Sequence, residues 1–148
     1  MGFDFSLHAV LHLRQSIERQ QELRLHAANQ QVARVQRGIA QVDARTHELQ
    51  AAQSRDLSSG ITAAELRFGL QCVAKLLRQR QELDLQRIRL EQLRDLQLAT
   101  YQQARRSRQT LEAVRDQQLR LYQKEAARRQ QRDLDDLFLL RREYLRRG

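Results

Sequence analysis

Two histidines one helical turn apart, His8 and His12, are the residue pair in this sequence that is best spaced to hold a metal ion. Asp4 lies one turn before them, but a zinc site needs three or four ligands and no third ligand is evident. We therefore expect both histidines to be solvated or to face a partner. The sequence predicts no metal and no cofactor.

Cys72 is the lone cysteine, which rules out an internal disulfide and suits a reducing cytoplasm. A catalytic thiol would need a positioned base, and His26 and His47 fall on the other arm of the chain. We expect Cys72 to fill space on an apolar helix face. Neither a glycine-rich phosphate loop nor an acid pair is present, and two packed helices enclose no pocket, so we predict a non-enzymatic protein.

The elements that would carry these residues are long helices, because the 148 residues include no proline. One turn signal interrupts them, the run Ser58-Ser59-Gly60-Ile61-Thr62. Gly60 can take a left-handed conformation, and Thr62 with Glu65 fits a capping box that starts a new helix. We predict a single all-α domain: an antiparallel two-helix coiled-coil hairpin with a first arm over about 4–57, a turn over 58–62 and a second arm over about 63–146.

Apolar residues in each arm recur at alternating steps of three and four, the pattern of a coiled-coil seam. A step of eight from Ile17 to Leu25, passing Gln21, should locally unwind the supercoil. Asp4 and Ser6 are the expected caps of the first helix. The predicted seam consists of Leu25, Val32, Val35, Ile39, Val42 and Leu49 in the first arm, and of Leu83, Leu90, Leu93, Leu111, Val114 and Leu121 in the second.

The second arm is longer than the first. Either it overshoots the first arm when it folds back, or residues 63–80 form a separate short helix at the turn, which Gly69 and a less regular pattern favour.

An apolar cluster, Leu134–Leu145, is flanked by arginines near the C-terminus. It could pack against Phe3, Phe5, Leu7 and Val10 and close the open end of the hairpin. It could instead insert into a partner through aromatic and Arg side chains, or lie on a membrane surface as a basic amphipathic helix.

The net charge of +9 lies almost entirely in the second half, because the first 60 residues carry seven Arg and six acids. This basic arm is expected to be a solvated face or to dock on an acidic protein surface. Specific nucleic-acid binding is not expected, because no binding motif is present and acidic residues interrupt the charge. No segment is apolar enough to span a membrane and no signal peptide is visible.

The opening Phe3-x-Phe5-x-Leu7-x-x-Val10-Leu11-x-Leu13-Arg14 and the mid-chain Ser59-Gly60-Ile61-Thr62 resemble the FliJ family of flagellar export proteins. The resemblance covers almost the whole chain. The related stalk family of virulence type III secretion is similar in architecture, so the sequence leaves flagellar and virulence export both open.

The resemblance implies a cytoplasmic stalk at the inner face of the membrane. It would bind and stimulate the hexameric export ATPase, contact the export gate protein and escort export chaperones. The expected ATPase-facing end consists of Phe3, Phe5, Leu7, Val10, Leu137, Phe138, Arg141, Arg142, Tyr144 and Arg146. The alternative is a generic basic coiled-coil scaffold or a nucleic-acid-associated protein.

Overall fold

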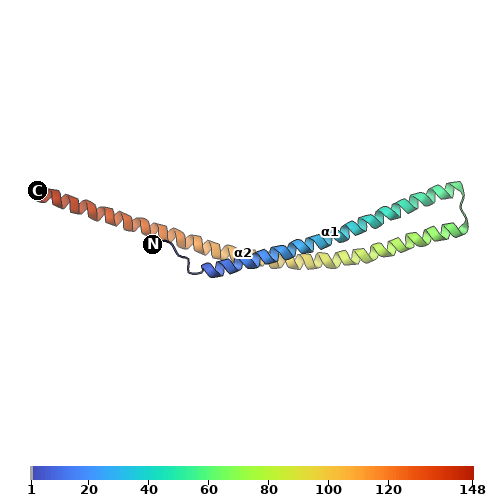
Figure 1. Ribbon diagram of the computed structural model, residues 1–148, viewed down its shortest axis with the longest axis horizontal. Coiled ribbons are helices and arrows are strands. Elements are labelled where there is room, and N and C mark those ends of the chain that lie inside the picture. The colour runs from blue at the N-terminus through green and yellow to red at the C-terminus, as the bar shows by residue number, and fades with distance from the viewer. Residues whose placement is uncertain (1) are drawn as a thin grey trace. The chain divides into compact units, whose positions relative to one another are not determined.

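The computed structural model describes residues 2–148 and contains two helices, α1 (His8–Ser59) and α2 (Ala63–Arg147). The helices run antiparallel and are joined by one short connection (Figure 1). No strand occurs within residues 2–148. The prediction of an all-α two-helix hairpin is therefore confirmed.

The connection between the helices has the chemistry that the sequence predicted. Gly60 has a φ of 87°, a left-handed conformation that a side chain would strain. The amide of Thr62 donates to Glu65 Oε2, and the amide of Glu65 donates to Thr62 Oγ1, both at 3.2 Å. This reciprocal pair is a capping box, which satisfies two amide donors that the first turn of α2 leaves free.

Contacts divide the chain into two compact units. One unit is Arg19–Gln102, which contains the turn and most of α1. The other combines Met1–Glu18 with Gln103–Gly148. The two units are described separately below.

In the unit Arg19–Gln102, the first-arm residues predicted for the seam are all buried or half-buried. Val32 and Val42 are the most enclosed, at 3% and 5% exposed. Opposite them, Leu83 packs on Gly38, whose missing side chain lets the leucine approach closely. Two helices bury only a narrow stripe between them, so these small β-branched residues form the core of this unit.

In α2, every second seam position lies one residue later in the sequence than predicted. Half-buried positions form two rows at seven-residue spacing, here called the seam rows. The first row agrees with the prediction at Leu83, Leu90 and Leu111. Leu93 and Leu121 are 59% and 61% exposed, so their assignment to the seam was wrong. The first row is Gly69, Leu76, Leu83, Leu90, Gln97, Ala104 and Leu111, and the second is Val73, Arg80, Arg87, Arg94, Tyr101, Arg108 and Arg115.

The physical reason for this shift is the dual character of arginine. Its aliphatic stem can cover apolar surface while its guanidinium reaches water or a carboxylate at the edge of the seam. A pattern search that admits only apolar residues selects Leu93, although Arg94 next to it is the half-buried side chain. Val114 is half-buried beside Arg115.

In the unit Met1–Glu18 with Gln103–Gly148, residues before α1 pack as part of the fold. Phe5 is 5% exposed and Leu11 is 2% exposed. The Phe3 ring lies 5.6 Å from the Tyr122 ring, centroid to centroid, in a tilted arrangement (52°). Helix α1 begins at His8, so Asp4 and Ser6 lie before its cap position, and the Leu7 carbonyl accepts the first bond, from Leu11.

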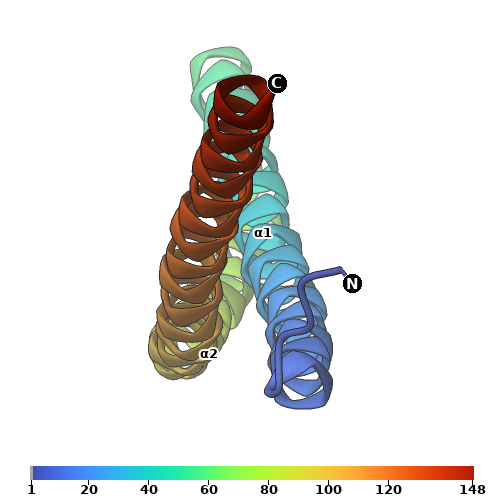
Figure 2. The ribbon, with the colours of Figure 1, turned by 90° about the vertical axis from the view of Figure 1, so that its left-hand side faces the viewer.

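Helix α2 has 85 residues and continues without a break from Ala63 to Arg147 (Figure 1). Figure 2 shows its C-terminal part, in orange and red, as a continuous helix. The alternative of a separate short helix over 63–80 was therefore wrong. Gly69 is accommodated inside the helix, where its bare backbone faces the side chain of Gln53. The 52 residues of α1 leave the last part of α2 without a helical partner.

Gln21 and Gln97 form a polar pair in the seam of the unit Arg19–Gln102. Gln97 Nε2 donates to Gln21 Oε1 at 2.7 Å and approaches the Gln21 carbonyl at 3.4 Å. Gln21 occupies the step of eight at which the apolar repeat fails. A polar pair is matched in only one alignment of two otherwise repetitive helices, so it favours this register.

A pair of glycine substitutions tests the backbone assignment. Gly60→Ala should destabilise the protein by about 1 kcal/mol, because alanine is strained at positive φ. Gly38→Ala should stabilise it by about 0.5–1 kcal/mol, since alanine is the better helix former and its Cβ would meet Leu83 at an ordinary 3.7 Å. Urea unfolding followed by circular dichroism measures both changes in the free energy of unfolding. If both substitutions changed it in the same direction, the assignment would be contradicted.

The glutamine pair gives a second prediction. Gln97→Leu should cost about 1 kcal/mol, because Gln21 Oε1 loses its donor in a part-buried site. The double variant Gln21→Leu/Gln97→Leu should recover that loss, since an apolar pair leaves no polar group unmatched. A double variant less stable than the single one, in the same urea titration, would contradict this role.

Candidate partner-binding surfaces

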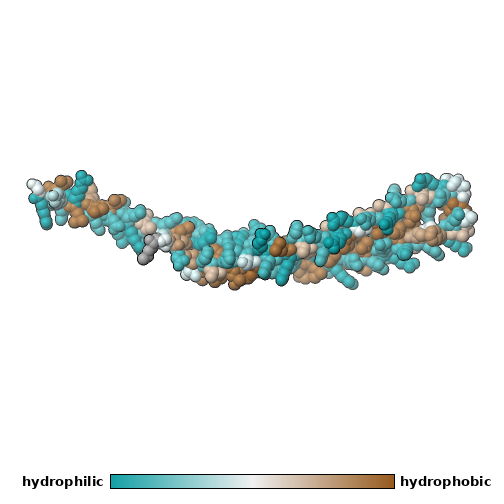
Figure 3. Space-filling view, viewed as in Figure 1, coloured by the Kyte–Doolittle hydropathy of each residue, from teal (hydrophilic) through white to brown (hydrophobic). Residues whose placement is uncertain are grey.

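The last part of α2, residues 123–147 and here called the C-terminal arm, is a helix with one isolated half-buried position. From residue 127 onward every residue is exposed. Its large apolar side chains are 54–81% exposed. These are Leu134, Leu137, Phe138, Leu139, Leu140, Tyr144 and Leu145. Figure 3 shows brown, hydrophobic patches near the C-terminus. Such a cluster of exposed apolar groups is typical of an interaction site.

The predicted ATPase-facing residues divide into three groups by exposure. Phe3 and Phe5 are used inside the fold, where Phe3 contacts Tyr122 and Phe5 is buried. Leu7 and Val10 are partly exposed, at 39% and 40%. The C-terminal members, Leu137, Phe138, Arg141, Arg142, Tyr144 and Arg146, are all exposed.

The interpretation that Leu134–Leu145 packs on the N-terminal aromatics was therefore wrong. Phe3 contacts Tyr122, whereas Leu134 and the apolar residues after it keep at least half of their surface exposed. The step from Tyr122 to Leu134 is 12 residues, or about 18 Å along a helix, which takes the cluster beyond reach of this contact.

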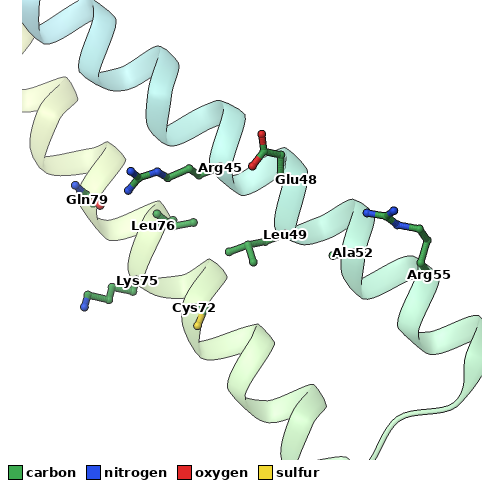
Figure 4. Close-up of a pocket in the computed structure, with 9 residues that line it drawn as sticks. All are labelled: Arg45, Glu48, Leu49, Ala52, Arg55, Cys72, Lys75, Leu76 and Gln79. Carbon is green, nitrogen blue, oxygen red and sulfur yellow. The ribbon is translucent and has the colours of Figure 1, made fainter.

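A second candidate surface is an open groove beside the turn, in the unit Arg19–Gln102. It has a volume of about 800 Å³. Leu49 and Leu76 project into it from α1 and α2, while Lys75 extends away from it (Figure 4). We call it the turn groove; its lining is Arg45, Glu48, Leu49, Ala52, Arg55, Cys72, Lys75, Leu76 and Gln79.

Small side chains explain why this region is hollow. Ala52 and Cys72 line both the turn groove and an adjoining cavity of about 480 Å³, and neither is long enough to reach across. Cys72 is half-buried there as a free thiol. In the adjoining cavity, Gln53 packs over Gly69, and its Nε2 is buried without a hydrogen-bond partner.

The arginines of the second seam row are held by carboxylates. Arg80 pairs with Asp43 across the seam at 2.6 Å, and Arg87 bridges Asp84 and Glu91 on its own helix at 2.8 and 3.1 Å. These two carboxylates raise the pKa of Arg87, with the Asp84 hydrogen bond the larger cause. The guanidinium therefore stays charged, as the ion pairs require.

Arg108 has the most enclosed ion pairs of this row. It binds Glu18 of α1 through Nε and also bonds Glu112 of its own helix at 2.6 Å. The three side chains are only 15–29% exposed. Both carboxylates raise the pKa of Arg108, Glu18 more than Glu112. This cluster favours the register in which Arg108 of α2 lies opposite Glu18 of α1.

The histidines singled out by their spacing are exposed, both His8 and His12. Within residues 2–148, no group of three or more His, Cys, Asp or Glu side chains is arranged to hold a metal ion. Over the same residues, neither helix has a stretch long and apolar enough to cross a membrane.

Sequence reasoning missed two features of these surfaces. The arginine row was visible as Arg at every seventh residue through positions 80, 87 and 94, and again at 108 and 115. The turn groove had no comparable signal, because it arises from small residues on two helices that the sequence does not place side by side.

A helical hairpin with an exposed apolar and basic helix end and an open groove beside its turn defines a coiled-coil scaffold that offers surfaces to other proteins. Residues 3–148 match the protein family described as "Flagellar FliJ protein". The chain belongs to this family, and is therefore a component of flagellar protein export, as its resemblance predicted. Searches of curated proteins and of solved structures gave no match.

The Arg108 cluster makes a prediction about stability. Arg108→Met should cost about 1–3 kcal/mol, because Glu18 and Glu112 lose the cation that both of them bind. Arg94→Met is the matched control in the same row, because its partner Asp95 is 66% exposed; it should cost less than about 1 kcal/mol. Thermal and urea unfolding of both variants checks the difference, and equal costs would contradict it.

Proposed function

We propose that this protein is a stalk-like coiled coil that binds and stimulates the hexameric flagellar export ATPase without catalysing a reaction itself. It would link the ATPase to the export gate and to export chaperones. In this proposal it acts in the cytoplasm, at the inner face of the membrane.

The observation that carries the proposal is the C-terminal arm. Phe138 and Tyr144 are 67% and 81% exposed on a helix that also carries Arg141, Arg142 and Arg146. Aromatic and arginine side chains are the usual anchors of protein interfaces. A single helix about 10 Å wide can enter a narrow opening such as the centre of a ring, which a broader domain could not.

A linker between two partners also needs a second surface. The turn groove supplies one, because residues 80–122 of α2 separate it from the C-terminal arm and it has its own apolar lining from Leu49 and Leu76. Arg45, Arg55 and Lys75 against Glu48 give its rim a positive balance. A gate segment or chaperone that binds here would therefore be apolar with acidic flanks.

The paired arginines argue against the alternative of a nucleic-acid-associated scaffold. Arg80, Arg87, Arg94, Arg108 and Arg115 of the second seam row each have a carboxylate within 3.4 Å. Charges that are already paired release fewer counterions on binding a phosphate backbone. The pairs leave the net charge of +9 unchanged, because that sum already subtracts the acids, but they occupy five arginines that a phosphate backbone would otherwise contact.

The test is the ATPase rate of the cognate hexamer at increasing amounts of this protein. Full-length protein should raise the rate, and removal of residues 134–148 should abolish the stimulation while leaving the helical signal per residue unchanged, because these residues pack on no other element. A matched control, Leu85→Glu, alters an exposed leucine elsewhere on α2 (61%) and should retain stimulation.

Two outcomes would contradict the proposal. One is the absence of both stimulation and co-migration with the ATPase. The other is salt-sensitive binding to DNA of any sequence with an affinity above that for the ATPase, which would favour the basic scaffold instead.

A further inference from the structure

Five apolar residues of the C-terminal arm lie on a different helix face from the seam rows. Continued at seven-residue spacing past Tyr122, the seam rows become charged at six of seven positions. These positions are Glu125, Arg129, Arg132, Asp136, Leu139, Glu143 and Arg146. A second helix extending the hairpin seam along the arm would therefore meet charged side chains.

The apolar side chains recur instead at spacings of three and four from Leu134, on a face that we call the apolar stripe. At about 100° per residue, the stripe is rotated by about 170° from the continued seam rows. Its members are Leu134, Leu137, Phe138, Arg141, Tyr144 and Leu145, and the five apolar ones are 60–81% exposed.

Arg141 sits in the middle of this stripe. Within residues 2–148, no carboxylate forms an ion pair with it. On the continued seam rows, Arg129 is paired with Glu125 of its own helix at 3.0 Å, whereas Arg132 has no ion pair within the described residues. Arg146 and Arg147 fall in the last turn of α2, where they complement the helix dipole. Within the described chain, Arg141 has neither an ion pair nor a place in that last turn.

We propose that the apolar stripe docks as a single helix into an apolar groove of a protein partner that carries a carboxylate opposite Arg141. This inference rests on the proposed function, in which that partner is the export ATPase. It adds which face of the helix binds and what chemistry receives it. The mode is an amphipathic helix in a groove, read through side chains at spacings of three, four and seven.

Charge favours a different protein, rather than a second copy of this chain, as the partner of the apolar stripe. Residues 123–148 carry eight basic and five acidic side chains, so two copies would repel. An antiparallel pair with Leu134 opposite Leu137 places Asp135 level with Asp136 of the other copy. A parallel pair places Arg141 beside Arg141.

A lipid surface is also disfavoured by the charges. Asp133 and Asp135 border the stripe on its two sides and would face anionic headgroups. Arg141 would lie inside the apolar face rather than on the polar face, where basic residues of membrane-surface helices gather. A protein groove can meet both features with fixed charges of its own.

The experiment compares two leucines of the same arm. Leu137→Glu changes the stripe, and Leu139→Glu makes the same change on the continued seam rows; the two side chains are 62% and 54% exposed. With the cognate hexameric ATPase as the probe, calorimetry should show Kd raised about tenfold or more by Leu137→Glu and by less than about twofold by Leu139→Glu. Circular dichroism should show equal helicity for both.

A second pair tests the charge. Arg141→Glu should weaken binding about tenfold or more, whereas Arg132→Glu on the continued seam rows should change it by less than about threefold. Equal losses in both members of either pair would overturn the assignment of the binding face while leaving ATPase binding itself intact. Failure of the unaltered protein to bind the ATPase would overturn the proposed function together with this inference.

Two further measurements on the unaltered protein and on Leu137→Glu address the other occupants. Light scattering that shows a dimer in the former and a monomer in the latter would identify a second copy and overturn the proposal. Co-sedimentation of the unaltered protein with phosphatidylglycerol vesicles, lost in Leu137→Glu, would identify a lipid surface and would also overturn the proposal.

Discussion

The pairing of α1 with α2 depends on side chains that are apolar along their length and charged at their tip. A two-helix seam encloses few side chains, and the most fully buried apolar ones within residues 2–148 are Val32, Val42, Leu11 and, ahead of α1, Phe5. Arginine widens the seam without a third helix, because its stem covers apolar surface while its head meets a carboxylate at the edge. The hairpin therefore combines a small apolar core with a row of ion pairs.

This construction sets how much of the molecule could be predicted from sequence. Local chemistry was sufficient for the turn, where Gly60, Thr62 and Glu65 behave as their residue types require. The regular apolar repeat of the first arm was also sufficient. In the second arm the repeat selected Leu93, whereas the structure half-buries Arg94, because the stem of an arginine can cover apolar surface although the residue type is polar. Hydropathy alone carries no such information.

The candidate surfaces were also predictable only where residue types near one another in the sequence were sufficient. The exposed anchors Phe138, Arg141 and Tyr144 could be named because an apolar and basic cluster near a terminus is visible in the sequence. Their separation from Phe3 could not, since it depends on α2 running unbroken through Gly69. The turn groove depends on two small residues, Ala52 and Cys72, that face a common space only after the hairpin has formed.

In helix α2, the residues that pair with α1 and the residues proposed to bind a partner lie on different faces. Up to Arg115 its seam rows consist of half-buried positions, and ion pairs satisfy the arginines there. Beyond Tyr122 the same rows turn charged, and the apolar residues move to another side of the helix. An apolar stripe that continued the seam would offer α1 a second stretch of α2 to pair with and would allow the hairpin to slip in register. Placing it on another face keeps the pairing of α1 unique and leaves the end of α2 free for a different protein.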